Sequence, residues 1–113
     1  MAVVEQKSVH DPMMLVEQKA GEVAETLLVS ERFVQLFLFG SRATGRAVPR
    51  SDIDIGLYLG HPVSPEVLAA IREAFDELPI LQKVDVVDFA TVDDAFKVVA
   101  LQQTRNLYER EAA

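Results

Sequence analysis

Two short apolar runs, separated by a short spacer, limit the folds open to this chain more than any other feature. Residues 32–40 read RFVQLFLFG, and residues 51–59 read SDIDIGLYL. Both runs are rich in aromatic and branched side chains, which favours β-strands, and both are too short for a long helix. The spacer contains the turn-forming residues Gly45 and Pro49 and holds at most one helical turn. Because it is too short for a crossover helix, the two strands are expected to pair antiparallel.

Alternating helix and strand signals fill the rest of the chain. Asp11 before Pro12 is typical of a helix start, and apolar residues at helical spacing extend this helix over 12–29. The same signals predict a helix over 64–78, a strand over 83–89, a helix from a capping box at Thr91 and Asp94 to about Gln103, and a short strand over 106–110. The helix between the second and third strands permits a parallel crossover. The predicted fold is an α/β or α+β domain, a small mixed sheet with helices packed against it.

Length and composition exclude several classes of protein. The 113 residues suffice for one domain, so we expect a lead-in over 1–11 and a single domain over 12–110. A net charge of −7 does not suit phosphate neutralisation along a duplex, so no nucleic acid ligand is expected; it suits a basic protein partner or divalent cations. The absence of cysteine excludes disulfides, zinc-thiolate sites and a cysteine nucleophile. With no leader pattern and no run of membrane-spanning length, the expected location is the cytoplasm.

Two carboxylates at the start of the second strand carry the strongest chemical signal. Asp52 and Asp54 are two residues apart, so their side chains leave the same face of the strand, while Ile53 and Ile55 leave the other. Carboxylates at this spacing can converge on magnesium, which takes one or two protein carboxylates together with substrate phosphates. Two such ions can clamp a phosphoryl or nucleotidyl displacement. The structural alternative for Asp-x-Asp after a serine is a capping or turn feature.

A third carboxylate is expected from the third strand, which offers Asp85 and Asp88 on opposite faces. Asp85 is flanked by valines inside the strand and needs a partner more urgently than Asp88, which lies near the strand end, where a turn role is easy. We therefore assign Asp85 to the metal and keep Asp88 as the weaker candidate. An exposed strand face is the structural alternative for Asp85.

A phosphate-binding turn is predicted at the end of the first strand. Gly40 lets the backbone approach a ligand closely, and the Ser41 hydroxyl and the following backbone N–H groups can hold phosphate oxygens. Arg42, Arg46 and Arg50 make this the one locally basic segment of an acidic chain, and arginine suits phosphate recognition. An ordinary turn and a solvated loop are the structural alternatives.

The segments GSRATGRAVPRSDIDI and VDVVDF together resemble the nucleotidyltransferase superfamily of DNA polymerase β. The family pattern is a Gly-Ser, a spacer, an Asp-x-Asp and a later aspartate on a neighbouring strand. The ten-residue spacer and the short chain are most similar to the minimal nucleotidyltransferases, or MNT proteins. The resemblance covers about residues 12–110, and the stretch from Gly-Ser to Asp-x-Asp is its most specific part.

The resemblance implies a function and a set of roles. Gly40, Ser41 and Arg42 would hold the triphosphate of ATP, and Asp52, Asp54 and Asp85 would bind two Mg²⁺ ions and carry catalysis. MNT proteins commonly act as antitoxins that transfer AMP to a tyrosine of a partner toxin, a ribonuclease with a HEPN domain. Since this chain shows no separate acceptor domain, the acceptor is expected to be selected by a partner or within a homo- or hetero-oligomer.

Two other functions remain open. A non-catalytic antitoxin would act by covering its HEPN partner, but it would not need the three carboxylates. A small-molecule nucleotidyltransferase of the antibiotic-modifying kind would need the acceptor domain that this chain does not show.

Overall fold

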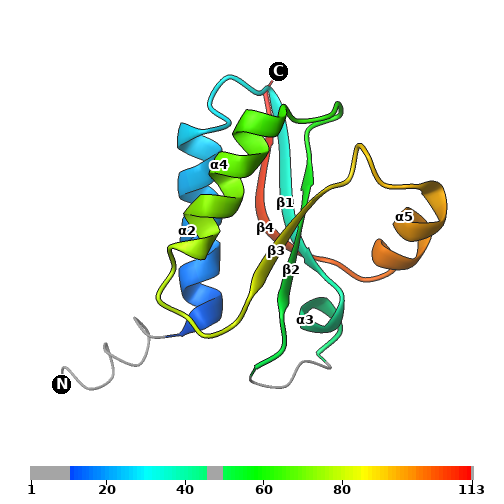
Figure 1. Ribbon diagram of the computed structural model, residues 1–113. Helices are drawn as coiled ribbons and strands as arrows, with labels where there is room; N and C mark the ends of the chain where they lie inside the picture. The colour runs from blue at the N-terminus through cyan, green and yellow to red at the C-terminus, as the bar shows by residue number, and fades with distance from the viewer. Residues whose placement is uncertain (1–10, 46–49, 113) are drawn as a thin grey trace.

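The computed structural model describes residues 11–45 and 50–112 as four helices and four strands (Figure 1). In chain order these are α2 (Pro12–Thr26), β1 (Phe33–Phe39), α3 (Ser41–Thr44), β2 (Ile53–Tyr58), α4 (Pro65–Asp76), β3 (Val84–Asp88), α5 (Asp94–Ala100) and β4 (Arg105–Glu111). Most of the lead-in predicted for 1–11, together with Arg46 and Pro49 of the spacer, lies outside the described residues.

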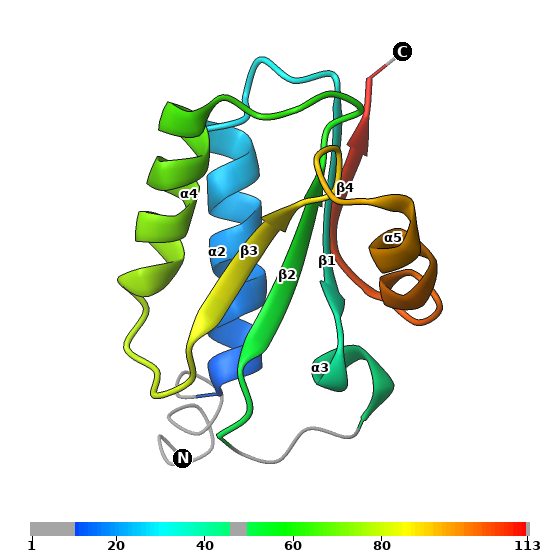
Figure 2. The same ribbon diagram turned by 45° about the vertical axis from the view of Figure 1, so that its right-hand side comes forward.

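The strands form one mixed sheet in the order β3-β2-β1-β4, seen almost edge-on in Figure 1 and more openly in Figure 2. β1 pairs antiparallel with β2, as the short spacer predicted, and β2 pairs parallel with β3 across the helix α4. β4 returns to the other side of β1, antiparallel, with a register shift between Leu36 and Phe37. The prediction of a small mixed sheet covered by helices is therefore confirmed.

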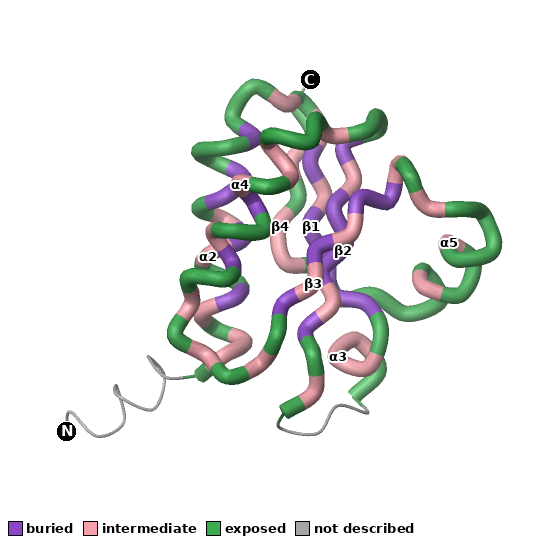
Figure 3. The backbone as a smooth tube through the Cα atoms, in the orientation of Figure 1, coloured by how far each residue is buried: buried purple, intermediate pink, exposed green. Residues whose placement is uncertain are grey.

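The two faces of the sheet are covered very differently. Helices α2 and α4 pack side by side on one face, where the alternating residues Ile53, Ile55 and Leu57 of β2 are fully buried. The other face carries a smaller cluster of three phenylalanines, Phe37, Phe39 and Phe89, with α5 beside it. Figure 3 shows buried segments following β1 and β2, whereas α5 is exposed or half-buried along its length. The sparsely covered face is therefore the one with room for a ligand.

The boundaries of helices α2 and α5 differ from those predicted. The first helix ends at Thr26 and continues as a turn, three residues short of the expected end. The capping box at Thr91 was wrong: Asp93 is the N-cap of α5, and its carboxylate accepts the backbone N–H of Phe96 at 2.7 Å. The Thr91 hydroxyl instead donates to the backbone carbonyl of Asp88, because the chain still turns there. The helix then ends at Ala100 rather than near Gln103.

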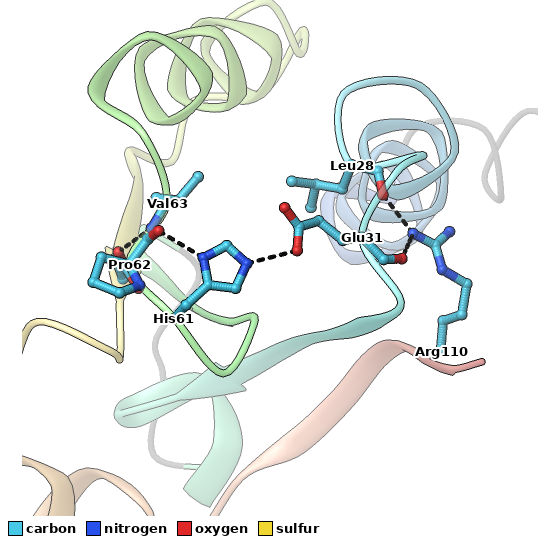
Figure 4. A network of polar contacts seen from close by, with 7 residues as sticks. Leu28, Glu31, His61, Pro62, Val63 and Arg110 are labelled. Atoms are coloured by element: carbon cyan, nitrogen blue, oxygen red, sulfur yellow. Dashed lines mark hydrogen bonds and ion pairs between the residues drawn. The ribbon is translucent and has the colours of Figure 1, made fainter. Parts of the chain in front are cut away.

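Polar contacts fasten the loops at the end of the sheet remote from α3 (Figure 4). The Arg110 guanidinium, on β4, donates to the backbone carbonyls of Leu28 and Glu31, which closes the turn after α2. The Glu31 carboxylate in turn lies 2.7 Å from Nε2 of His61, and this hydrogen bond raises the pKa of the exposed imidazole. These contacts tie three separate chain segments together without involving the predicted site.

Within residues 11–45 and 50–112, no helix combines the length and the apolar character needed to cross a membrane.

Candidate active site

Sheet pairing brings two of the three predicted carboxylates together. Asp54 of β2 and Asp85 of β3 are direct partners in the parallel register, so their side chains leave the same face of the sheet. This is the face opposite α2 and α4, because the neighbours Ile53 and Val84 are buried on the helix-covered side. Asp52 lies just before β2 and is exposed. Asp54 and Asp85 thus lie side by side near the start of β2, and Asp52 lies two residues earlier in the chain.

Burial and neighbouring negative charges both act on the carboxyl group of Asp54. Partial burial of its carboxyl group, and then the negative charges of Asp85 and Asp52, raise the pKa of Asp54 above its usual value. Among the described residues, however, no three histidine or carboxylate side chains stand close enough to form a metal-binding group. Asp54 therefore lies within the electrostatic influence of Asp85 and Asp52, but the three carboxylates do not form a closed set of metal ligands. Magnesium does not require such a cage, since substrate phosphates and water commonly complete its shell.

Asp85 and Asp88 occupy different environments on β3. The Asp85 carboxylate is half-exposed and lies 3.6 Å from the Lys83 ammonium. Asp88 is buried on the opposite face, where its carboxylate accepts the backbone N–H groups of Val63 at 2.9 Å and Ala90 at 3.0 Å. Asp88 therefore holds the chain turns that follow β2 and β3. Asp85 is the carboxylate that β3 presents beside Asp54.

Gly40 is required where it stands for two independent reasons. Its backbone adopts φ 73° and ψ −149°, a region open essentially to glycine alone. A Cβ atom at this position would also lie 2.8 Å from Oδ2 of Asp54, closer than a real Cβ contact allows. The pairing of Phe39 with Asp54 across the antiparallel strands explains this proximity. The Gly-Ser turn and the Asp-x-Asp strand, distant in the sequence pattern, are thus in direct contact.

The turn after Gly40 is a short helix, α3, that begins at Ser41. Its arginine, Arg42, donates from Nη2 to the backbone carbonyl of Ser51 at 2.7 Å, which ties α3 to the start of β2. Arg42 therefore positions the two halves of the site relative to each other, a role that its sequence context did not predict. Arg50, the other arginine of the spacer within the described residues, is exposed.

An open pocket of about 550 Å³ adjoins the Gly-Ser turn. Gly40, Ser41 and Thr44 form one wall, and residues of α5 with the following turn form the other. Gly40 lies in the pocket wall and leaves no space for a side chain on its Asp54 side, so the pocket adjoins the carboxylates, although none of them lines it. The arrangement offers carboxylates, a glycine turn and an adjoining cavity in one place, which suits a substrate that carries both phosphates and an apolar part.

The family model described as "Polymerase beta, Nucleotidyltransferase" matches residues 22–113, most of the chain. The chain belongs to this nucleotidyltransferase family. Its sequence is 27% identical over 96 residues to the probable protein adenylyltransferase MntA of Haemophilus influenzae, covering 82% of this chain and 84% of that protein.

Solved structures share the fold of this nucleotidyltransferase. One is a tri-AMPylated HEPN toxin of Shewanella oneidensis in complex with an MNT antitoxin, matched with a TM-score of 0.57 and 19% identity over 87% of this chain and 72% of that one. Another is a toxin–antitoxin with AMP-PNP, matched with a TM-score of 0.56 and 23% identity over 81% of this chain and 72% of that one. The polymerase β-type fold predicted from the Gly-Ser and Asp-x-Asp segments is confirmed.

The contribution of α5 to the site was missed in the sequence. The apolar residues 96, 98 and 99 of this helix, with Leu101 directly after it, do not fall on a single helical face, and all four are exposed in the structure. A helix that packs only on a core confines its apolar residues to one stripe. The irregular distribution of these apolar residues could have indicated that this segment does more than pack on the core. In the structure it forms the second wall of the pocket.

Proposed function

We propose that this nucleotidyltransferase is an Mg²⁺-dependent antitoxin that transfers AMP from ATP to a tyrosine hydroxyl of a HEPN ribonuclease toxin. The observation that supports the proposal is the close approach of the Gly40 turn to Asp54, which itself lies beside Asp85. A phosphate group held at this turn would lie near both carboxylates. The names of the relatives, an adenylyltransferase and antitoxins of HEPN toxins, supply the acceptor class.

Each site residue has a proposed role. Gly40 and Ser41 hold the triphosphate with backbone N–H groups and the serine hydroxyl, and Arg42 supports them by fixing α3 on the start of β2 and by its positive charge. Asp52, Asp54 and Asp85 would hold two magnesium ions. Such ions would supply activation of the attacking oxygen and neutralisation of the charge on the leaving pyrophosphate. Burial, and then the charges of Asp85 and Asp52, raise the pKa of Asp54, and a cation bound beside it would favour its ionised form.

The transfer itself is a single displacement at the α-phosphorus of ATP. The tyrosine oxygen forms a bond to this phosphorus as the bond to pyrophosphate breaks, and the hydroxyl proton passes to a carboxylate oxygen of Asp85, which releases it to water. The half-exposed position of Asp85 allows both an incoming hydroxyl and that release. The product is an AMP-tyrosine phosphodiester, and the blocked toxin loses its activity.

The proposal includes a setting for the reaction. We propose that residues 12–110 act as one nucleotidyltransferase domain in the cytoplasm and that the toxin or a second subunit contributes to the acceptor side. A net charge of −7 attracts a ribonuclease, whose surface must be basic to bind RNA.

One observation favours a second function, a binding-only antitoxin. The described residues hold no group of three carboxylate or histidine side chains close enough for a metal ion. In that case the chain would neutralise the toxin by covering it, and nucleotide would be irrelevant.

Magnesium and nucleotide together should stabilise the fold. The expected gain is about 2.7 kcal/mol in the free energy of unfolding at a nucleotide concentration a hundred times Kd. The measurement is thermal unfolding with AMP-PNP, with magnesium, with both, and with both after chelation by EDTA. Only the combination should give the full shift, because the carboxylates repel nucleotide phosphates until cations intervene. Identical unfolding curves in all four conditions would contradict nucleotide binding at this site.

A further inference from the structure

The loop between β2 and α4 is held at two points by side chains from other segments. On one side, Nε2 of His61 lies 2.7 Å from a carboxylate oxygen of Glu31, in the turn after α2 (Figure 4). On the other side, the carboxylate of Asp88, at the end of β3, accepts the backbone N–H of Val63 at 2.9 Å. The attachment of this loop to the turn after α2 therefore runs through the imidazole of His61.

Both ring nitrogens of His61 face acceptor oxygens. Nδ1 lies 2.9 Å from the backbone carbonyl oxygen of Pro62, while Nε2 faces the carboxylate of Glu31. A neutral imidazole has one N–H group, so it can donate to one of these oxygens and must turn a lone pair toward the other. The imidazolium has two N–H groups and can donate to both. The arrangement is therefore complete only when the ring is protonated.

The charged groups around the ring favour the same form. The hydrogen bond to Glu31, then the one to the Pro62 carbonyl, raise the pKa of His61, and the negative charge of Asp88 adds a smaller contribution in the same direction. Arg110, on β4, donates to the backbone carbonyl of Glu31 at 2.8 Å. Arg110 thus fixes the main chain of Glu31 while the carboxylate of Glu31 faces His61.

We propose that His61 and Glu31 form a pH-dependent latch that fastens the β2–α4 loop to the turn after α2 while the imidazole is protonated. When the ring loses its proton to water, one of its two hydrogen bonds is lost and the loop loosens. The side chain of His61 is 54% exposed, so this proton exchanges freely with solvent. Because the pKa of His61 is higher in the folded state than its ordinary value of 6.5, the latch contributes its full stability below pH 6.5 and loses it as the pH rises through the raised pKa. The latch lies at the end of the sheet remote from α3 and does not depend on the proposed function.

Titration of His61 by NMR tests the latch directly. The full chain would carry His10→Gln, so that His61 is the one remaining histidine. We expect its titration midpoint to lie above 6.5 and to move toward 6.5 in Glu31→Gln, because the amide keeps the size of the side chain but removes its charge. The backbone amide signal of Val63 should shift with the same midpoint as the ring, since the loop responds to the loss of the proton. A midpoint at or below 6.5, or one that Glu31→Gln leaves in place, would overturn the proposal.

Glu22→Gln is the matched control for Glu31→Gln. Glu22 is the carboxylate partner in another ion pair, with Lys19 on the surface of α2, so its replacement removes the same charge without touching the latch. We expect Glu22→Gln to leave the titration midpoint of His61 unchanged. An equal movement of the midpoint in both variants would show an effect of overall charge and would count against a direct bond.

Chemical denaturation provides an independent test that does not use Glu31→Gln, and it stands even if that variant fails to fold. The free energy of unfolding is compared between the chain with His61 and the variant His61→Gln, at about pH 5.5 and at about pH 9, on either side of the histidine range. We expect His61→Gln to be less stable at the lower pH and the difference to shrink at the higher pH, where both chains lack the imidazolium. A stability difference that is the same at both pH values would assign His61 a role in packing alone and refute the latch.

Discussion

Replacing Asp52 and Asp54 together by asparagine should reduce AMP transfer to the toxin by at least about a thousandfold. Asparagine keeps the size of each side chain but removes the negative charges proposed to hold magnesium. The measurement is incorporation of radioactive AMP from α-labelled ATP into a purified HEPN toxin. Labelling by the double variant at the wild-type rate would contradict the roles given to these two residues.

The double variant should remain folded, so that a loss of AMP transfer cannot be attributed to unfolding. The single change Asp54→Asn shows why. In the folded protein the pKa of Asp54 is raised by burial and by Asp85 and Asp52, so the ionised carboxylate is disfavoured in the native state. At neutral pH and without magnesium, Asp54→Asn should therefore raise the free energy of unfolding. The advantage should shrink as the pH falls through the raised pKa and vanish below the ordinary value of 3.8, where the carboxyl is protonated in both states.

Gly40→Ala should have the second large effect, a loss of both stability and activity. The methyl group forces an unfavourable backbone conformation, at a cost of about 1–3 kcal/mol, and meets Oδ2 of Asp54 at 2.8 Å. Because the Asp54 carboxylate must move, transfer should fall about a hundredfold beyond what reduced stability explains. Chemical denaturation and the labelling assay measure the two losses separately.

Gly60→Ala is the matched control for this change. Gly60 also has a positive φ, 83°, but a Cβ atom there would meet nothing within 4 Å. We expect it to lose stability and to retain its transfer rate in the folded protein. If Gly40→Ala retained the same transfer rate as Gly60→Ala, the close approach of the Gly-Ser turn to Asp54 would not matter for catalysis.

Much of the fold could be predicted because short-range signals agreed with the tertiary structure. The antiparallel pairing of β1 with β2 follows from a spacer too short for any other connection, and Ser64 caps α4 where the sequence placed it. The α5 cap was misplaced because Thr91, Asp93 and Asp94 all offer capping side chains within four residues. In the structure the Thr91 hydroxyl is engaged in the turn after β3, where it donates to the backbone carbonyl of Asp88.

The sequence suggests the residue types of the candidate site but not the contacts among them. That Asp54 and Asp85 share a face follows from strand alternation once β2 and β3 are known to be parallel neighbours. The approach of Gly40 to Asp54 depends on the register of β1 on β2, which no local pattern specifies. The bond from Arg42 to Ser51 and the second wall at α5 likewise arise from tertiary packing.

Mass analysis of the toxin tests the central claim most directly. A HEPN toxin would be co-expressed with the wild-type chain, purified, and compared by intact-mass and peptide mass spectrometry with the same toxin co-expressed with the Asp52→Asn/Asp54→Asn variant. The account predicts one or more AMP groups on a tyrosine of the toxin in the first sample and none in the second. A toxin that is neutralised by the wild-type chain yet carries no AMP would contradict the account and establish a binding-only antitoxin.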